Sequence, residues 1–81
     1  RASLVAELTC GDTSARVLIL DVSVGGCGLD QAPALPVDAE ICLRLDTGRR
    51  LDGRVRWQNG ARAGVLFSRQ LSFTDPLVSA G

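Results

Sequence analysis

Asp21 and Ser23 stand two positions apart at the end of an apolar stretch, directly before a turn that is rich in glycine. On an extended strand, residues two positions apart point to the same side. The pair therefore offers carboxylate oxygens and a hydroxyl group to one planar, polar ligand, and Gly26 would let the backbone approach that ligand. The same groups could instead hydrogen-bond the backbone of the turn itself, which is a common role for Asp and Ser.

The residue types that are missing exclude several kinds of chemistry. The chain has no His, which excludes Ser-His-Asp and Cys-His catalysis and His-based metal sites. It has no Lys, which excludes Schiff-base chemistry and the lysine of a phosphate-binding loop. We therefore expect a protein that is not an enzyme, with no catalytic residue, no metal site and no cofactor.

Three cysteines occur in the chain, and no two of them form a Cys-x-x-Cys pair. An odd number of cysteines without metal-binding spacing is typical of reduced thiols, and it favours a cytoplasmic protein. We expect Cys10, Cys27 and Cys42 to be small, buried apolar side chains that form no disulfide.

Length and composition indicate one globular domain over residues 1–81, because the chain is short and 46% hydrophobic. The absence of Met suggests a segment of a longer protein. The longest apolar run, residues 17–20, is too short to cross a bilayer, so membrane insertion is not expected. Zero net charge and only three aromatic residues argue against binding to duplex nucleic acid.

Apolar and polar residues alternate along most of the chain, which predicts strands. Gly11-Asp12-Thr13-Ser14 and Asn59-Gly60 are typical of turns, and Asp75-Pro76 could begin a short C-terminal helix. The alternation places Trp57 on the same inward face as Val55. The predicted strands are residues 4–10, 16–22, 28–31, 40–46, 50–58 and 62–68.

These strands predict an all-β fold, a small six-stranded antiparallel β-barrel, because closing the sheet removes its exposed edges. The core should take the inward residues of each strand. Those expected inside are Leu8, Val17, Ile19, Ile41, Leu43, Leu45, Val55, Val65 and Phe67.

Charge is distributed unevenly along the chain. Residues 1–43 carry a net charge of −4, and residues 44–69 carry a net charge of +5. The basic hairpin between Arg44 and Arg62 could hold an anion. It could equally be the solvated outer face of the barrel.

Three motifs in order resemble a PilZ domain, and the resemblance covers residues 1–71. They are Asp21-x-Ser23-x-x-Gly26, the strand Gly53-x-Val55-x-Trp57, and the strand Gly64-Val65-x-Phe67. The resemblance implies a six-stranded barrel that often ends in a short helix. It also implies a receptor for the bacterial second messenger cyclic di-GMP.

In PilZ domains an Arg-x-x-x-Arg segment before the first strand binds the phosphates and stacks on guanine, while the Asp-x-Ser-x-x-Gly motif meets a guanine edge. Asp21, Ser23 and Gly26 match the second motif. Only Arg1 stands for the first, because position 5 is Val. The resemblance therefore implies a ligand site made of Arg1, Asp21, Ser23 and Gly26.

Two functions follow from this incomplete match. In the first, the chain binds cyclic di-GMP and so regulates a protein partner or an attached effector domain. Alternatively, it is a degenerate PilZ barrel that binds no nucleotide and acts as a protein–protein interaction module. An Arg four residues before Arg1 in the full-length protein would favour the receptor.

Overall fold

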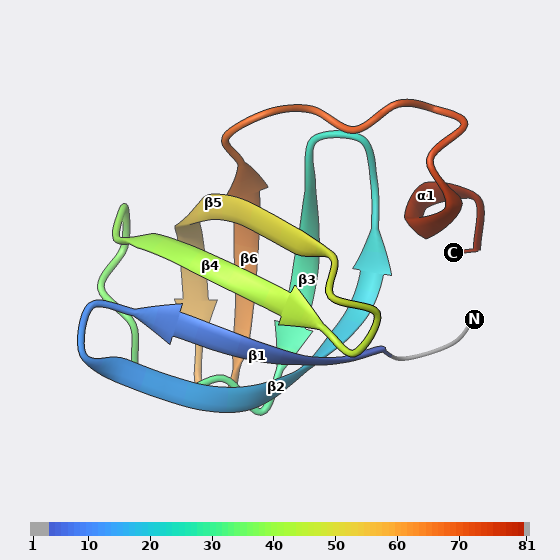
Figure 1. Ribbon diagram of the computed structural model, residues 1–81. Helices are drawn as coiled ribbons and strands as arrows, with labels where there is room; N and C mark the ends of the chain where they lie inside the picture. Colours follow the sequence, from blue (N-terminus) through green and yellow to red (C-terminus); the bar gives the residue numbers. More distant parts are fainter. Residues whose placement is uncertain (1–3, 81) are drawn as a thin grey trace.

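The computed structural model describes residues 4–80 of the chain, which form a closed antiparallel barrel followed by a short helix. The order of strands around the barrel is β1-β2-β3-β6-β5-β4, and β4 pairs with β1 to complete it (Figure 1). The all-β prediction is therefore confirmed. The elements are β1 (Leu4–Cys10), β2 (Thr13–Val22), β3 (Gly26–Asp30), β4 (Glu40–Leu45), β5 (Arg50–Asn59), β6 (Arg62–Phe67) and α1 (Pro76–Ala80).

Alternate residues of every strand fill the inside of the barrel. Leu8, Leu43 and Val55 have no exposed surface, and all nine side chains predicted for the core are buried. The outward residues between them are mostly charged or polar, so the alternation of the sequence becomes the inside and outside of the barrel. The rest of the core consists of Ala6, Cys27, Leu29, Ala32, Leu35, Leu51 and Ala63.

Two-residue turns join β1 to β2 and β5 to β6. Gly11 and Gly60 each take the first central position with a φ of +57° and +62°. Other residues rarely adopt that conformation, which explains glycine at both sites. Because the first turn is this tight, β2 begins at Thr13, three residues before the predicted start.

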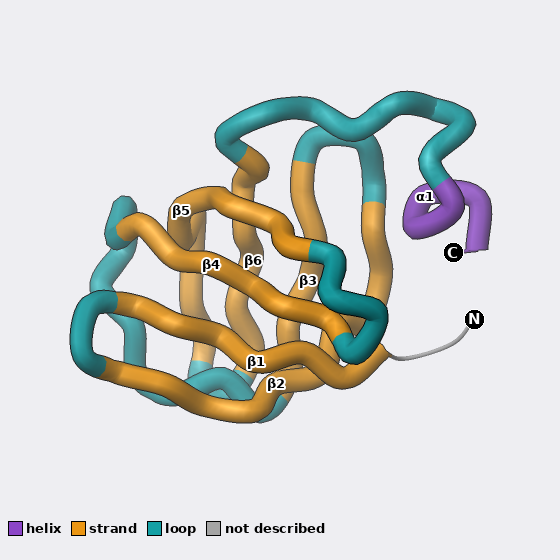
Figure 2. Tube along the Cα trace, in the orientation of Figure 1, coloured by secondary structure: helices purple, strands orange, loops and turns teal. Residues whose placement is uncertain are grey.

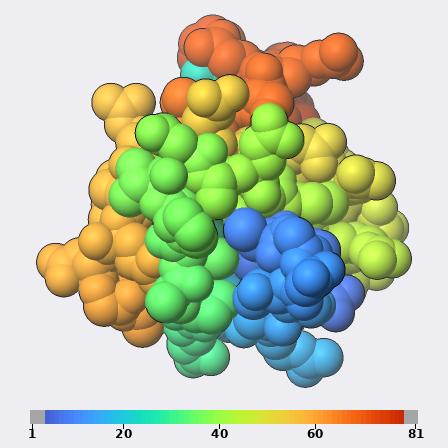
Figure 3. All heavy atoms as spheres, turned by 90° about the vertical axis from the view of Figure 1, so that its left-hand side faces the viewer, coloured from blue at the N-terminus to red at the C-terminus, as the bar shows by residue number. Residues whose placement is uncertain are grey.

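The connector of residues 31–39 closes one end of the barrel. Figure 3 shows it (green) between β1 (blue) and the β5–β6 hairpin (light orange). Gln58 fixes it there: its amide nitrogen donates to the Pro33 carbonyl at 2.7 Å, and its amide oxygen accepts from the Leu35 backbone at 2.7 Å. Leu35 is thereby held in the core as a plug.

The C-terminal segment crosses the other end of the barrel between β6 and α1 (Figure 2). Its Leu71 backbone N–H donates to the Val24 carbonyl at 2.7 Å, which attaches it to the β2–β3 turn. Closer to α1, Asp75 of this segment makes a two-point ion pair with Arg49, which directly precedes β5, at 3.0 and 2.6 Å. The predicted short helix is present, and Asp75 caps it by accepting from the Leu77 N–H at 3.0 Å.

Two β-bulges interrupt the alternation. In β2 the pairing steps from Ile19 to Asp21 while β3 advances by one residue, and β5 steps from Val55 to Trp57 in the same way against β6. An extra residue in a strand reverses the faces of the residues after it. The prediction that Trp57 faces inward with Val55 is therefore wrong, because the bulge at Arg56 turns the indole to the outside.

Candidate functional site

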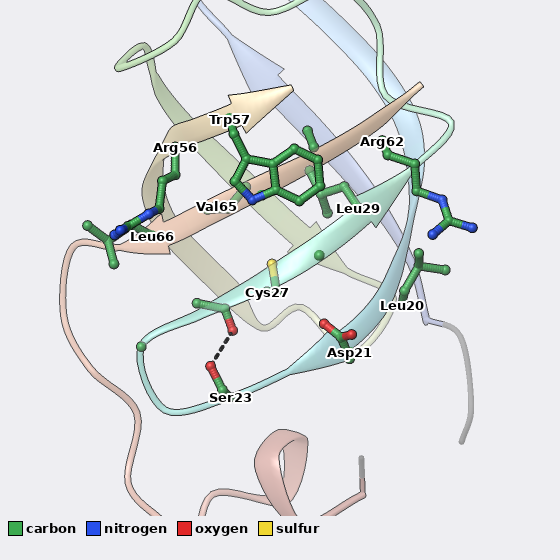
Figure 4. A pocket seen from close by; sticks show the side chains of 15 residues that line it. Leu20, Asp21, Ser23, Cys27, Leu29, Arg56, Trp57, Arg62, Val65 and Leu66 are labelled. Atoms are coloured by element: carbon green, nitrogen blue, oxygen red, sulfur yellow. Dashed lines mark hydrogen bonds between the residues drawn. The ribbon is translucent and has the colours of Figure 1, made fainter. Parts of the chain in front are cut away.

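A groove with a volume of about 510 Å³ lies on the outer face of four neighbouring strands, β2, β3, β6 and β5. Figure 4 looks into it. The bulge residue of β2, Leu20, and the bulge residue of β5, Arg56, both line it. The two bulges thus flank the groove and re-aim the side chains beside them.

The floor of the groove is a glycine pair. Gly28 of β3 lies opposite Gly64 of β6, so the sheet has no side chain at either position. Asp21 pairs with Gly28 on one side, and Trp57 pairs with Gly64 on the other. Asp21, Gly28, Gly64 and Trp57 therefore form one row across four strands, with a carboxylate and an indole at its two ends.

Asp21 leans over the glycine next to it. A side-chain carbon added at Gly28 would lie 3.1 Å from Asp21 Oδ1, so the carboxylate occupies space that only glycine leaves open. Without the bulge at Leu20, strict alternation would turn Asp21 inward with Val17 and Ile19. The bulge instead leaves the carboxylate exposed at the groove, where it can accept hydrogen bonds from a ligand.

Trp57 lies against the other glycine of the floor. A side-chain carbon at Gly64 would collide with the Nε1, Cε2 and Cδ1 atoms of the indole. In Figure 4 the ring is seen almost face-on, so its plane runs along the sheet. Since the residue is still 47% exposed, the outer face of the ring is open to solvent and suits stacking by another planar group.

Ser23 lies in the β2–β3 turn at the edge of the groove. Its backbone N–H donates to the Gly26 carbonyl at 2.9 Å, and its hydroxyl donates to the same oxygen at 3.2 Å. The serine therefore holds the turn closed. This is the alternative role given above, in which the side chain hydrogen-bonds the backbone of the turn itself. Its hydroxyl oxygen can still accept a hydrogen bond from a donor in the groove.

Gly26 is needed for a reason that differs from the one predicted. A side-chain carbon there would run into the Val65 carbonyl oxygen of β6. The close approach is thus between two strands of the barrel, whereas the sequence suggested an approach between the backbone and a ligand. Gly26 lines the groove, but its lack of a side chain serves the packing of β3 against β6.

Three charged side chains line the groove, one carboxylate and two guanidiniums: Asp21, Arg56 and Arg62. Figure 4 shows Arg56 beside Leu66 and Arg62 at the opposite end, near Leu20. The charged lining therefore has an excess of one positive charge.

A planar group with hydrogen-bond donors on its edge and a negative charge elsewhere fits this lining best. In the comparison with protein families, the model of the PilZ domain matches residues 1–77. The chain belongs to the PilZ domain family. No curated protein and no solved structure was found to match it.

The family assignment confirms the resemblance drawn from the three motifs. PilZ domains are in general receptors for cyclic di-GMP and act as binding or adaptor domains. In this PilZ domain, Asp21, Ser23 and Gly26 come together at one groove. Arg1, the fourth predicted site residue, lies outside the described residues.

The sequence analysis missed the far wall of the groove. Arg56, Trp57 and Arg62 were placed by alternation alone, which gave no reason to associate them with Asp21. The signal that could have found them is glycine inside strands, at Gly28 and Gly64, because interior glycine often marks a bulge or a close approach.

All three cysteines are free thiols. Cys27 is buried, but Cys10 and Cys42 are only half-buried, so the prediction that all three are buried is wrong for these two. Burial, and secondarily the negative charge of Asp21, raises the pKa of the Cys27 thiol to about 12. Within residues 4–80 no three His, Cys, Asp or Glu side chains cluster so as to hold a metal ion. No helix in that part of the chain is long and apolar enough to span a membrane.

Proposed function

We propose that this PilZ domain binds cyclic di-GMP in the groove over β2, β3, β6 and β5, and that the bound ligand regulates a protein partner or an attached effector domain. The observation that carries the proposal is the row in which Asp21 and Trp57 flank two glycines. It joins a hydrogen-bond acceptor to an aromatic face across a floor without side chains.

Each group has a role that follows from its chemistry. The Asp21 carboxylate accepts hydrogen bonds from the N–H groups on a guanine edge, with the Ser23 oxygen as a second acceptor. Trp57 offers its open face to a base. Arg1 supplies a guanidinium for a phosphate, since the planar fork of Arg matches phosphate oxygens in two-point contacts.

Trp57 provides the readout, because it is the single tryptophan of a chain that has no tyrosine. Titration with cyclic di-GMP should change its emission in a saturable way, and calorimetry should give the same midpoint. Asp21→Ala should weaken binding about 10- to 150-fold, the worth of a hydrogen bond to a charged group. Asp46→Ala, an exposed carboxylate at the β4–β5 turn, is the matched control and should bind as the parent does.

The same titration should be run on a longer chain that carries the native residues before Arg1. An Arg at the fourth position upstream should tighten binding. If neither chain gives heat or an emission change at millimolar cyclic di-GMP, the receptor function is excluded. The domain would then be the degenerate barrel that serves as a protein–protein interaction module.

A further inference from the structure

The groove presents a charge problem to an anionic ligand. Cyclic di-GMP carries a negative charge on each of its phosphodiester groups, and Asp21 places another negative charge on one wall. Like charges at close range repel, and the repulsion is larger where the protein excludes water. A ligand that hydrogen-bonds Asp21 therefore needs cations close by.

Arg56 and Arg62 are the two cations in the lining of the groove. They come from the basic part of the chain, residues 44–69, which carries seven of its nine arginines. Both side chains are exposed and project from the outer face on which Asp21 lies. The β5–β6 hairpin thus brings two positive charges to the groove.

Neither guanidinium is firmly engaged elsewhere in the described part of the chain. Arg62 Nε lies 3.6 Å from Asp30 Oδ1, which is too long for a hydrogen bond, and its side chain is 63% exposed. Arg56 has no ion pair with any residue from 4 to 80. Arg49, by contrast, is held by two hydrogen bonds to Asp75. Arg56 and Arg62 can therefore turn toward a ligand without breaking a strong contact.

We propose that Arg56 and Arg62 bind the phosphate groups of the ligand from opposite ends of the groove. This role rests on the proposed function, since the ligand is the one named there. It also accounts for the N-terminal motif of this chain, in which Arg1 has no partner at position 5. Here the β5–β6 hairpin supplies cationic contacts in addition to Arg1.

The experiment is a calorimetric titration of the full chain with cyclic di-GMP at two salt concentrations, about 0.02 M and about 0.3 M. The variants are Arg56→Gln, Arg62→Gln and the double variant. Arg16→Gln and Arg44→Gln are matched controls, because Arg16 of β2 and Arg44 of β4 line a different hollow of the surface and do not line the groove. Thermal melts are used to check that each variant is folded.

Each single variant should weaken binding about 10- to 150-fold, the worth of one charge-assisted hydrogen bond. Affinity of the parent should fall with added salt, and affinity of the double variant should fall less. The controls should bind as the parent does.

Equal affinity of parent and double variant, together with loss of binding in Asp21→Ala, would overturn the role of the two arginines and leave the proposed function standing. Equal losses in Arg16→Gln and Arg62→Gln would also overturn it, because the effect would then be one of overall charge. Absence of any binding by the parent would remove the proposed function and this inference together.

Discussion

Neighbouring glycines in the β2–β3 turn illustrate how much one residue can decide. A side-chain carbon at Gly26 would meet the Val65 carbonyl, which is backbone and cannot move aside, whereas one at Gly25 would meet nothing within 4 Å. Gly26→Ala should therefore destabilise the fold by about 1–3 kcal/mol or more, and Gly25→Ala should stay within about 0.5 kcal/mol of the parent. Urea denaturation of the two variants measures this, and equal stabilities would show that β3 and β6 can separate at little cost.

Leu43 tests the core at the same scale. It is fully buried in β4, and removing its side chain beyond Cβ leaves a cavity that a closed barrel cannot easily fill. Leu43→Ala should cost about 2–5 kcal/mol. Leu66→Ala, at an outward position that is 42% exposed, is the control and should change stability by less than about 0.5 kcal/mol. An unchanged melting curve for Leu43→Ala would mean that the residue is not in the core.

At the scale of elements, the strands were predictable and the bulges were not. Alternation depends on one strand alone, so it located all six strands and nine buried residues in five of them. Leu29 of the short strand β3 was not among the residues predicted for the core. A bulge depends on how two strands pair, and nothing in the local pattern around Leu20 or Arg56 shows an extra residue. Asp21 was expected at the surface because of the motif. The wall of the groove that contains Trp57 was not predicted, because alternation placed the indole inside the barrel.

The ion pair between Arg49 and Asp75 joins two elements far apart in the chain, the β4–β5 hairpin and α1. The hydrogen bonds from Arg49, followed by the one from the Leu77 N–H, lower the pKa of the Asp75 carboxyl below its ordinary value. A carboxyl whose pKa is lowered by folding stabilises the fold at pH values above its unfolded pKa, near 3.9, and the effect is lost as the pH falls through the lower, folded value.

Asp75→Asn should therefore melt at a lower temperature than the parent at pH 7, and the difference should shrink toward zero at about pH 2. Thermal melts of both proteins across this range measure it. Asp46→Asn alters an exposed carboxylate of the β4–β5 hairpin, which also carries Arg49. It should show a much smaller difference from the parent at pH 7. A constant difference at every pH would mean that the pair stabilises through packing and not through charge.

For the molecule as a whole, closure of the barrel is the property that governs access to the interior. Each strand has two hydrogen-bonded neighbours, so the sheet has no free edge. The barrel can open only if the pairing between two strands is broken. Closure was predictable because a short chain with six strands has few other ways to cover its edges. The order of strands needed the structure, since β3 pairs with β6 through residues far apart in sequence. Cys27 lies at that pairing, with its thiol inside the barrel.

Alkylation of Cys27, compared with that of Cys42, should therefore report on opening of the whole barrel. At pH 8 a thiol with a pKa of about 12 is ionised in roughly one molecule in ten thousand, and burial also blocks the reagent. Cys27 should react far more slowly than the half-buried Cys42 in the native protein, and both should react rapidly in urea. Leu43→Ala should speed the reaction of Cys27 about 30-fold or more. A loss of about 2 kcal/mol in the free energy of unfolding raises the fraction of open molecules by that factor. Mass spectrometry of digested samples measures each site. If Cys27 reacts as fast as Cys42 in the native parent, the barrel opens locally between β3 and β6 and does not behave as one closed unit.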